Sequence, residues 1–157
     1  MTYVFLSSIY RDITFDPFVN KFTNNIKTPF KNVSSIEVVK VTLPNTTAID
    51  SLGVLFLVLN DNINLNNLVI PNSFNSVQAI NKAFCAIPVT GSSSTNFISA
   101  DMGENSYKIE LNPPRDISNK FFIELRDLNG NLINFGESSG DLTFANQINI
   151  ILKLEFN

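Results

Sequence analysis

The final stretch of the chain carries the pattern that most restricts the fold. From residue 147 to residue 156 every second position is apolar, namely Ile148, Ile150, Leu152, Leu154 and Phe156. Successive side chains of a β-strand point to opposite faces, so a period of two places these five on one face. The other face is mostly polar. A strand with one such apolar face must lie against a second apolar layer, and we expect the other strands to assemble on it.

A hairpin is predicted before this strand. Two β-forming runs, residues 121–126 and 132–135, flank Asn129-Gly130. Asn-Gly between two such runs is a strong hairpin signal, because a type I′ turn needs positive φ at both central positions. The sequence therefore predicts a type I′ hairpin at this point.

Further strands are predicted upstream. Residues 33–43 are rich in β-branched side chains and apolar on both faces, which favours a central strand. Residues 54–59 form a continuous apolar run, typical of a fully buried strand. Phe18, Phe22 and Ile26 recur at intervals of four, which fits either a strand or a short helix. Shorter strands are expected at residues 3–6, 68–70, 85–90, 96–102 and 106–111, with Asn112-Pro113-Pro114 ending the last.

One short helix is expected. Ser73 can cap it, and Phe74, Val77, Ile80 and Phe84 follow at spacings that share one helix face. Core packing explains that stripe. About nine or ten strands with one helix, and no internal repeat or linker, indicate an all-β sandwich or barrel.

Composition narrows the classes of function. A chain of 157 residues is expected to form one domain with a full core. The net charge of −3 argues against nucleic-acid contact over the whole surface. Cys85 is the one cysteine, so no intrachain disulfide forms. No export signal opens the chain, and residues 54–59, the longest apolar run, are too short to span a membrane.

Catalytic chemistry is poorly represented. The chain has no histidine, which excludes His-dependent triads and zinc sites, and it has no glycine-rich phosphate loop. Glu37, Glu110 and Glu124 lie on predicted strands, and two carboxylates about 5–9 Å apart are what a glycosidase needs. Charge on the solvent face of a strand explains them more simply. We therefore predict no catalytic residue and no enzymatic activity.

Two polar stretches have side chains that could bind a cation. Asp127, Asn129 and Asn131 resemble the start of a calcium loop, but no glutamate stands where an EF-hand requires one, and a plain turn explains them. Residues 60–67 contain a single carboxylate, Asp61, which favours a solvated loop. We expect no bound metal and no cofactor.

The chain contains three Arg-Asp neighbours. In extended backbone, adjacent side chains point to opposite faces, so each arginine must find another partner. Arg115 and Arg126 are candidates for contacts across a subunit boundary, with a solvated arginine as the default. The three pairs are Arg11-Asp12, Arg115-Asp116 and Arg126-Asp127.

Three longer stretches carry a resemblance to a known family. SSIYRD at residues 7–12, followed by residues 18–22, looks like an N-terminal arm. VSSIEVVKVTLPNT at residues 33–46 is similar to the strand after it, which ends in a Pro-Asn turn. LRDLNGNLI, within residues 122–135, resembles a closing hairpin. Together they resemble the single-jelly-roll penton and minor capsid proteins of virophages and large DNA viruses.

The resemblance implies a single jelly roll of two four-stranded antiparallel sheets in residues 16–157, preceded by an N-terminal strand or arm in residues 1–15. It implies a structural protein of the virion, assembled inside the host cell. A penton protein forms a homopentamer at icosahedral vertices and contacts the major capsid protein. A weakly charged surface suits such contacts, because few ions are desolvated on assembly.

Two alternatives stay open. One is a minor capsid protein beneath the shell. The other is a glycan- or receptor-binding β-sandwich, which needs an exposed aromatic platform. The chain has no tryptophan and only three tyrosines, Tyr3, Tyr10 and Tyr107, which does not favour it.

Overall fold

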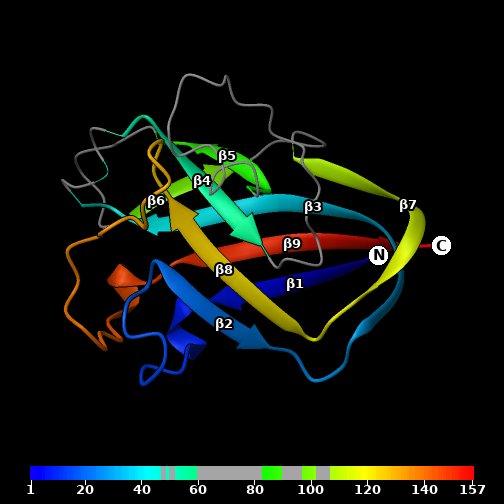
Figure 1. Cartoon of the computed structure of the whole chain (residues 1–157), viewed down its shortest axis with the longest axis horizontal. Helices are drawn as coiled ribbons and strands as arrows, with labels where there is room; N and C mark the ends of the chain where they lie inside the picture. Colours follow the sequence, from blue (N-terminus) through cyan, green and yellow to red (C-terminus); the bar gives the residue numbers. More distant parts are fainter. Residues whose placement is uncertain (47–48, 50–51, 60–82, 90–96, 102–106) are drawn as a thin grey trace.

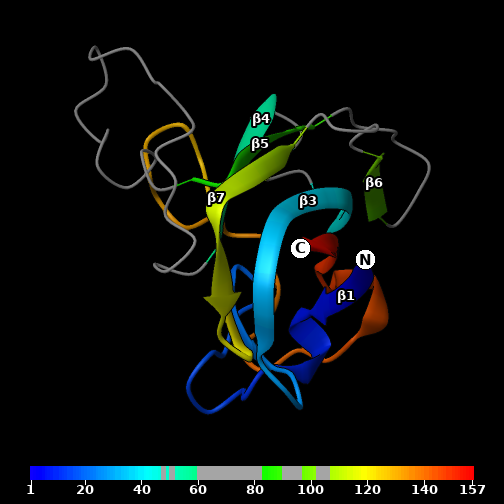
Figure 2. The same cartoon turned by 90° about the vertical axis from the view of Figure 1, so that its right-hand side faces the viewer.

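The computed structural model describes residues 1–46, 49, 52–59, 83–89, 97–101 and 107–157 (Figure 1). The fold is an all-β sandwich of two antiparallel sheets, as the sequence predicts. In Figure 1 the second sheet lies in front of the first, and Figure 2 turns the molecule by 90°.

The first sheet has the strand order β1-β9-β3-β6. Its members are β1 (Thr2–Ser7), β9 (Asn149–Phe156), β3 (Phe30–Pro44) and β6 (Phe97–Asp101). A fifth strand, β7 (Lys108–Ile117), pairs with the first half of β3, whereas β6 pairs with its last five residues. The long strand β3 is therefore central, with β9 along its other side.

The second sheet has the order β2-β8-β4-β5. Its members are β2 (Lys21–Asn25), β8 (Lys120–Arg126), β4 (Val54–Leu59) and β5 (Cys85–Pro88). Two short 3-10 helices, η1 (Ser8–Tyr10) and η3 (Phe144–Asn146), lie in connections. The edge strands β1 and β2 lie on the same side of the sandwich, the lower side in Figure 1.

The core forms between the two sheets. The alternating residues before and within β9 are buried as predicted, with Ile148, Ile150, Leu152 and Leu154 fully inaccessible to solvent. The central strand β3 and the buried strand β4 confirm the predictions for residues 33–43 and 54–59. The sequence fits either a strand or a short helix at residues 18–26, and the structure has a strand there, β2, with Phe22 in the core.

The predicted type I′ hairpin is wrong in its geometry. The chain reverses between Asp127 and Asn131, but only Gly130 has positive φ, at 80°. The Asp127 carboxylate accepts hydrogen bonds from the N–H groups of Asn129 and Asn131 at 2.8 and 2.9 Å. This side-chain bonding stabilises a wider turn, in which Asn129 needs no left-handed backbone. The predicted strand at residues 132–135 is a single bridge from Leu132 to Arg126.

The prediction that Asn112-Pro113-Pro114 ends a strand is also wrong, because β7 continues through it. The pairing register between β3 and β7 shifts there, from Ser35 opposite Glu110 to Val33 opposite Arg115. A bulged segment leaves backbone unpaired, so proline, which has no N–H, is accepted there.

Two predicted elements fall largely outside the described residues. These are the strand at residues 68–70 and the helix from Ser73. Ala83 and Phe84, at the end of the predicted helix stripe, are described and buried just before β5.

Candidate interaction surface

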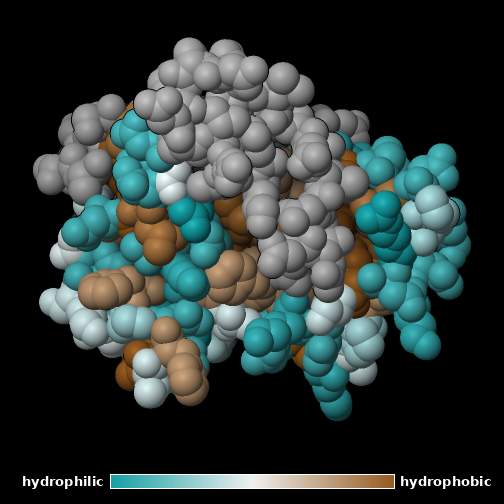
Figure 3. Space-filling view, in the orientation of Figure 1, coloured by the Kyte–Doolittle hydropathy of each residue, from teal (hydrophilic) through white to brown (hydrophobic). Residues whose placement is uncertain are grey.

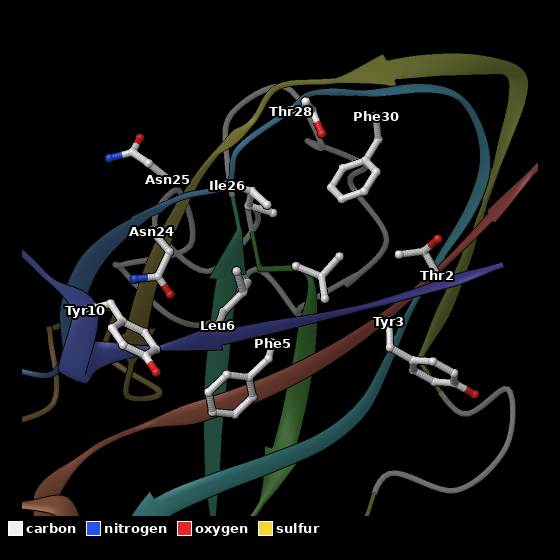
Figure 4. A pocket seen from close by; sticks show the side chains of 11 residues that line it. Thr2, Tyr3, Phe5, Leu6, Tyr10, Asn24, Asn25, Ile26, Thr28 and Phe30 are labelled. Carbon is white, nitrogen blue, oxygen red and sulfur yellow. The ribbon is translucent and has the colours of Figure 1, made fainter.

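A groove of about 500 Å³ opens between β1 and the segment that runs from β2 into β3 (Figure 4). Leu6, Ile26 and Phe30 point into it, and Val4 lines it as well. None of the described residues that line the groove is charged. The groove is therefore an uncharged opening into the side of the sandwich, with an apolar floor and polar residues among its lining.

Exposed aromatic residues lie close to this opening. Tyr3 and Phe5 point away from the groove, on the outer face of the first sheet, and Tyr10 lies at one end (Figure 4). These three side chains are 58%, 56% and 71% exposed. Large aromatic side chains at this exposure are common at interaction sites, because their burial in a contact releases apolar surface from water.

Asn24 closes one end of the β1 edge. Its Oδ1 accepts a hydrogen bond from the Ser7 N–H at 2.7 Å, and its Nδ2 donates to the Ser7 carbonyl at 3.0 Å. Asn24 is buried, so neither bond is in competition with bulk water. Nδ2 also donates to the Thr23 carbonyl of β2 at 3.2 Å, so the amide links an edge strand of each sheet.

A buried arginine holds the segment that follows β1. Arg11 is 5% exposed and donates to the carbonyl oxygens of Ser8 at 2.8 Å, Asp16 at 3.0 Å and Asp141 at 2.6 Å, and to Gln147 Oε1 at 2.9 Å. Burial lowers the pKa of Arg11, and the nearby carboxylates of Glu137, Asp141 and Asp16 oppose that shift. The guanidinium thus joins the chain after β1 to the loop before β9.

The same network reaches β9. Ser8 Oγ donates to Gln147 Oε1 at 2.7 Å and accepts from the Ile148 N–H at 2.9 Å. Gln147 Nε2 donates to the carbonyls of Asp141 and Thr143 at 3.1 and 3.0 Å. Sequence reasoning missed this cluster. The cluster joins two segments, residues 8–16 and 141–148, that lie more than a hundred residues apart, and no local spacing marks their contact.

The three glutamates that a glycosidase could use, Glu37, Glu110 and Glu124, are divided between the two sheets. Glu37 and Glu110 lie in the first sheet, where Lys153 Nζ is 3.1 Å from Glu37 and Lys108 Nζ is 2.9 Å from Glu110. Glu124 lies in the second sheet, with Arg126 Nε at 2.8 Å. Each carboxylate therefore has a basic partner in its own sheet. The Glu37 pair joins the neighbouring strands β3 and β9, whereas the Glu110 and Glu124 pairs each lie within one strand.

Glu155 connects the charged residues of the first sheet. Lys108 Nζ is 2.8 Å from Glu155 Oε2, Ser35 Oγ donates to the same oxygen at 2.8 Å, and Lys153 Nζ is 3.2 Å from Oε1. The bond from Lys108 is the largest cause that lowers the pKa of Glu155 to about 2. The hydrogen bond with Glu155 also raises the pKa of Lys108.

The arginines of the three Arg-Asp neighbours have different surroundings in the structure. Arg126 pairs with Glu124, two residues earlier on the same strand face, and not with Asp127. This agrees with the expectation that adjacent side chains of extended backbone diverge. Arg115 is exposed, and Arg11 is the buried centre of the network described above. Arg126 therefore has a partner within its own chain.

The candidate calcium residues form the turn described above, in which the Asp127 carboxylate is bound to main-chain N–H groups. Across the described residues, no group of three or more potential ligand side chains is placed to hold a metal ion. Asp61 and residues 60–67 lie outside that part of the chain. Cys85 is buried, and this burial raises the pKa of its thiol.

Within the described part of the chain, no helix has the length and apolar character needed to cross a bilayer. No family model matches the sequence, and a search of curated proteins finds no match. The function must therefore be inferred from the strand order, the surfaces and the sequence resemblance.

Proposed function

We propose that this chain is a structural capsid protein, a single jelly roll that forms a homopentamer at the icosahedral vertices of a virion. The strand order is the observation that carries the proposal. Within one chain, the strands of the first half pair in turn with those of the second half, as in a long antiparallel hairpin that is folded over. The pairs are β1 with β9, β2 with β8, β3 with β6 and β7, and β4 with β5.

This ribbon is wrapped so that successive pairs fall in alternate sheets. The pairs β1–β9 and β3–β6/β7 lie in the first sheet, and β2–β8 and β4–β5 lie in the second. A double-sheet jelly roll of eight strand positions has this arrangement, with β6 and β7 sharing one position beside β3. The strand order therefore supports the jelly roll that the sequence resemblance implies.

The distribution of exposed apolar residues supports a role in assembly. They concentrate in the segment that contains η1 and in the loop before β9, which are joined by the bond from Gly140 N–H to the Pro17 carbonyl at 2.8 Å. Apolar residues gather at the lower left of Figure 3, over the segment between β1 and β2. The exposed members are Tyr10, Ile13, Phe15, Phe18, Leu142 and Phe144. We call these six residues the apolar flank.

An apolar flank on one side of a subunit suits a fivefold ring, because a ring uses two different, complementary surfaces of each copy. In this proposal the ring contacts the surrounding major capsid protein within the virion, after assembly inside the host cell. A minor capsid protein beneath the shell is the alternative that uses the same fold and flank.

Light scattering during size-exclusion chromatography tests the ring. The expected particle has five times the mass of the 17.5-kDa chain. Phe144→Ser, at an 83% exposed position, should shift the particle toward the monomer. Leu132→Ser, at a 38% exposed position in the turn after β8, is the matched control and should leave the mass unchanged. A particle that stays monomeric at the concentration and ionic strength of assembly would contradict the proposal.

A glycan-binding role is the second candidate, and the exposed ring of Tyr10 at one end of the groove favours it. Asn25 and Thr28 also line the groove, and their polar groups suit sugar hydroxyls. Binding on a glycan array that is lost in Tyr10→Ala, with the fold retained, would support this role. An array without binding leaves the capsid proposal as the better one.

A further inference from the structure

The outer edge of β1 has unpaired main-chain groups in a defined register. β1 pairs with β9 along one side, and Ser8 N–H donates to the Ile148 carbonyl at 2.9 Å. Hydrogen-bonded positions alternate along an antiparallel strand, so Leu6, Val4 and Thr2 bond to β9. Tyr3, Phe5 and Ser7 then direct their N–H and C=O groups to the other side.

Asn24 occupies those groups at Ser7, as described above. Two residues are left, Tyr3 and Phe5, each with one donor and one acceptor. No described strand pairs with this edge. An exposed edge of this kind is a template for another strand.

We propose that the β1 edge binds the β1 edge of a second copy of this chain, antiparallel and about a twofold axis through the Val4 pair. Tyr3 then lies opposite Phe5 of the partner subunit. Their N–H and C=O groups exchange two hydrogen bonds, and the twofold axis repeats them. All four groups left by Asn24 find a partner, and the first sheets of the two copies become continuous.

The side chains agree with this register. The stretch Thr2–Ser7 has no charged residue, so two copies meet without like-charge repulsion and without desolvating an ion. Tyr3 and Phe5 lie on the same outer face, which places the ring of one copy opposite the ring of the other (Figure 4). Aromatic cross-strand pairs stabilise antiparallel sheets. On the inner face the two grooves meet across the Val4 pair.

The contact is short, so it belongs to the weak class of interfaces and forms at high local concentration. It is isologous, whereas the proposed ring is heterologous. The two proposals are therefore independent. The β1 contact would exist in a protein that forms no ring, and a ring can form without it.

Covalent trapping tests the contact. Residues at a position that is not hydrogen-bonded lie about 4.5 Å apart between Cα atoms, within the range that a disulfide spans. Val4→Cys should therefore give a disulfide-linked dimer under mild oxidation of the concentrated protein. Leu128→Cys, exposed in the turn after β8, is the control and should form no disulfide-linked dimer. Neither should the wild type, whose Cys85 lies on β5 in the second sheet and not on β1.

A second variant distinguishes a dimer that is held by main-chain hydrogen bonds from cross-linking through random encounters in solution. Phe5→Pro removes an N–H that faces the free edge and is not used within the subunit, so the fold should tolerate it. In the Val4→Cys background, Phe5→Pro should abolish the dimer, whereas Phe5→Ala should retain part of it. Circular dichroism checks that each variant is folded.

Each result of these experiments either supports or overturns the twofold contact between β1 edges. Equal dimer yields from Val4→Cys and Leu128→Cys, or a folded Val4→Cys protein that reacts with a small maleimide and gives no dimer, overturn the twofold contact. The second result would indicate that the β1 edge binds a segment of a different chain and not a second copy. Light scattering on the same samples reports the ring separately. A pentamer without the Val4 cross-link, or the cross-link without a pentamer, shows which proposal failed.

Discussion

The amide of Asn24 makes two hydrogen bonds to the main chain of Ser7, one accepted at 2.7 Å and one donated at 3.0 Å. Asn24 belongs to β2 and Ser7 to β1, so a single side chain links the edges of the two sheets. Because Asn24 occupies the main-chain groups of Ser7, the unpaired groups at the outer edge of β1 are those of Tyr3 and Phe5.

Replacing Asn24 should weaken the sandwich. Asn24→Leu leaves the buried N–H and C=O groups of Ser7 without partners, so the free energy of unfolding should fall by about 1–3 kcal/mol. Urea denaturation measures this change. Asn25→Leu, at the exposed neighbouring position, is the control and should change stability by less than about 0.5 kcal/mol. Equal losses in the two variants would show that the link carries no stability.

Arg11 should be required for the fold, although it is charged. Arg11→Met leaves the Gln147 Oε1 atom and the carbonyls of Ser8 and Asp141 short of a donor, and stability should fall by about 2–3 kcal/mol. Arg11→Lys should also destabilise, because an ammonium group cannot reproduce the planar fork of a guanidinium. Thermal melting compares both with Arg115→Met, an exposed control. A neutral Arg11→Met would contradict the network.

Stability should depend on pH through Glu155. Its pKa in the folded protein is lowered from the ordinary value of 4.5 to about 2, mainly by the bond from Lys108. A depressed pKa means that the folded state favours the ionised carboxylate. The contribution is therefore fully present above about pH 4.5 and is lost as the pH falls toward 2.

Melting curves between pH 2 and 5 test this dependence. Glu155→Gln should flatten the slope of stability against pH within that window. Lys108→Met should raise the pKa of Glu155, as followed by NMR, and Ser35→Ala should raise it less, because Ser35 is the smaller cause. A pKa of Glu155 near 4.5 in the wild type would refute the assignment.

The parts of the fold that could be predicted are those with a local signal. The alternation that ends in β9 and the β-branched run of β3 mark their faces in the sequence itself, because burial follows a period of two. The type of turn at Asp127 could not be predicted, because it depends on where the Asp127 side chain finds its hydrogen bonds. The continuation of β7 through its prolines could not be predicted, because a bulge depends on the register of a neighbouring strand.

The interaction surface could not be predicted for a related reason. Arg11 meets Asp141 and Gln147, which are 130 and 136 residues away in the chain. Nor does any local pattern tell an edge strand from an inner one. Tyr3 and Phe5 alternate with buried residues as they would in any sheet, and only the strand order exposes their main-chain groups.

Two of the 14 phenylalanines in the chain lie in opposite environments, and mutation can test the consequence. Phe121 is fully buried and meets the ring of Phe30 edge to face at 6.5 Å, whereas Phe15 is 82% exposed. Phe121→Ala should lower stability by about 3–5 kcal/mol, since it leaves a cavity between the sheets. Phe15→Ala should leave the monomer as stable as the wild type.

Substitutions of Phe15 and Phe121 should have the opposite order of effect on self-association. Phe15 lies in the apolar flank, so Phe15→Ala should weaken self-association in light scattering while its urea midpoint stays unchanged. Phe121→Leu keeps most of the core volume and should retain association if it folds. Loss of stability in Phe15→Ala would place that ring in the core. Unchanged association in Phe15→Ala and Phe144→Ser together would remove the apolar flank as the ring contact, and the capsid proposal would then need another surface.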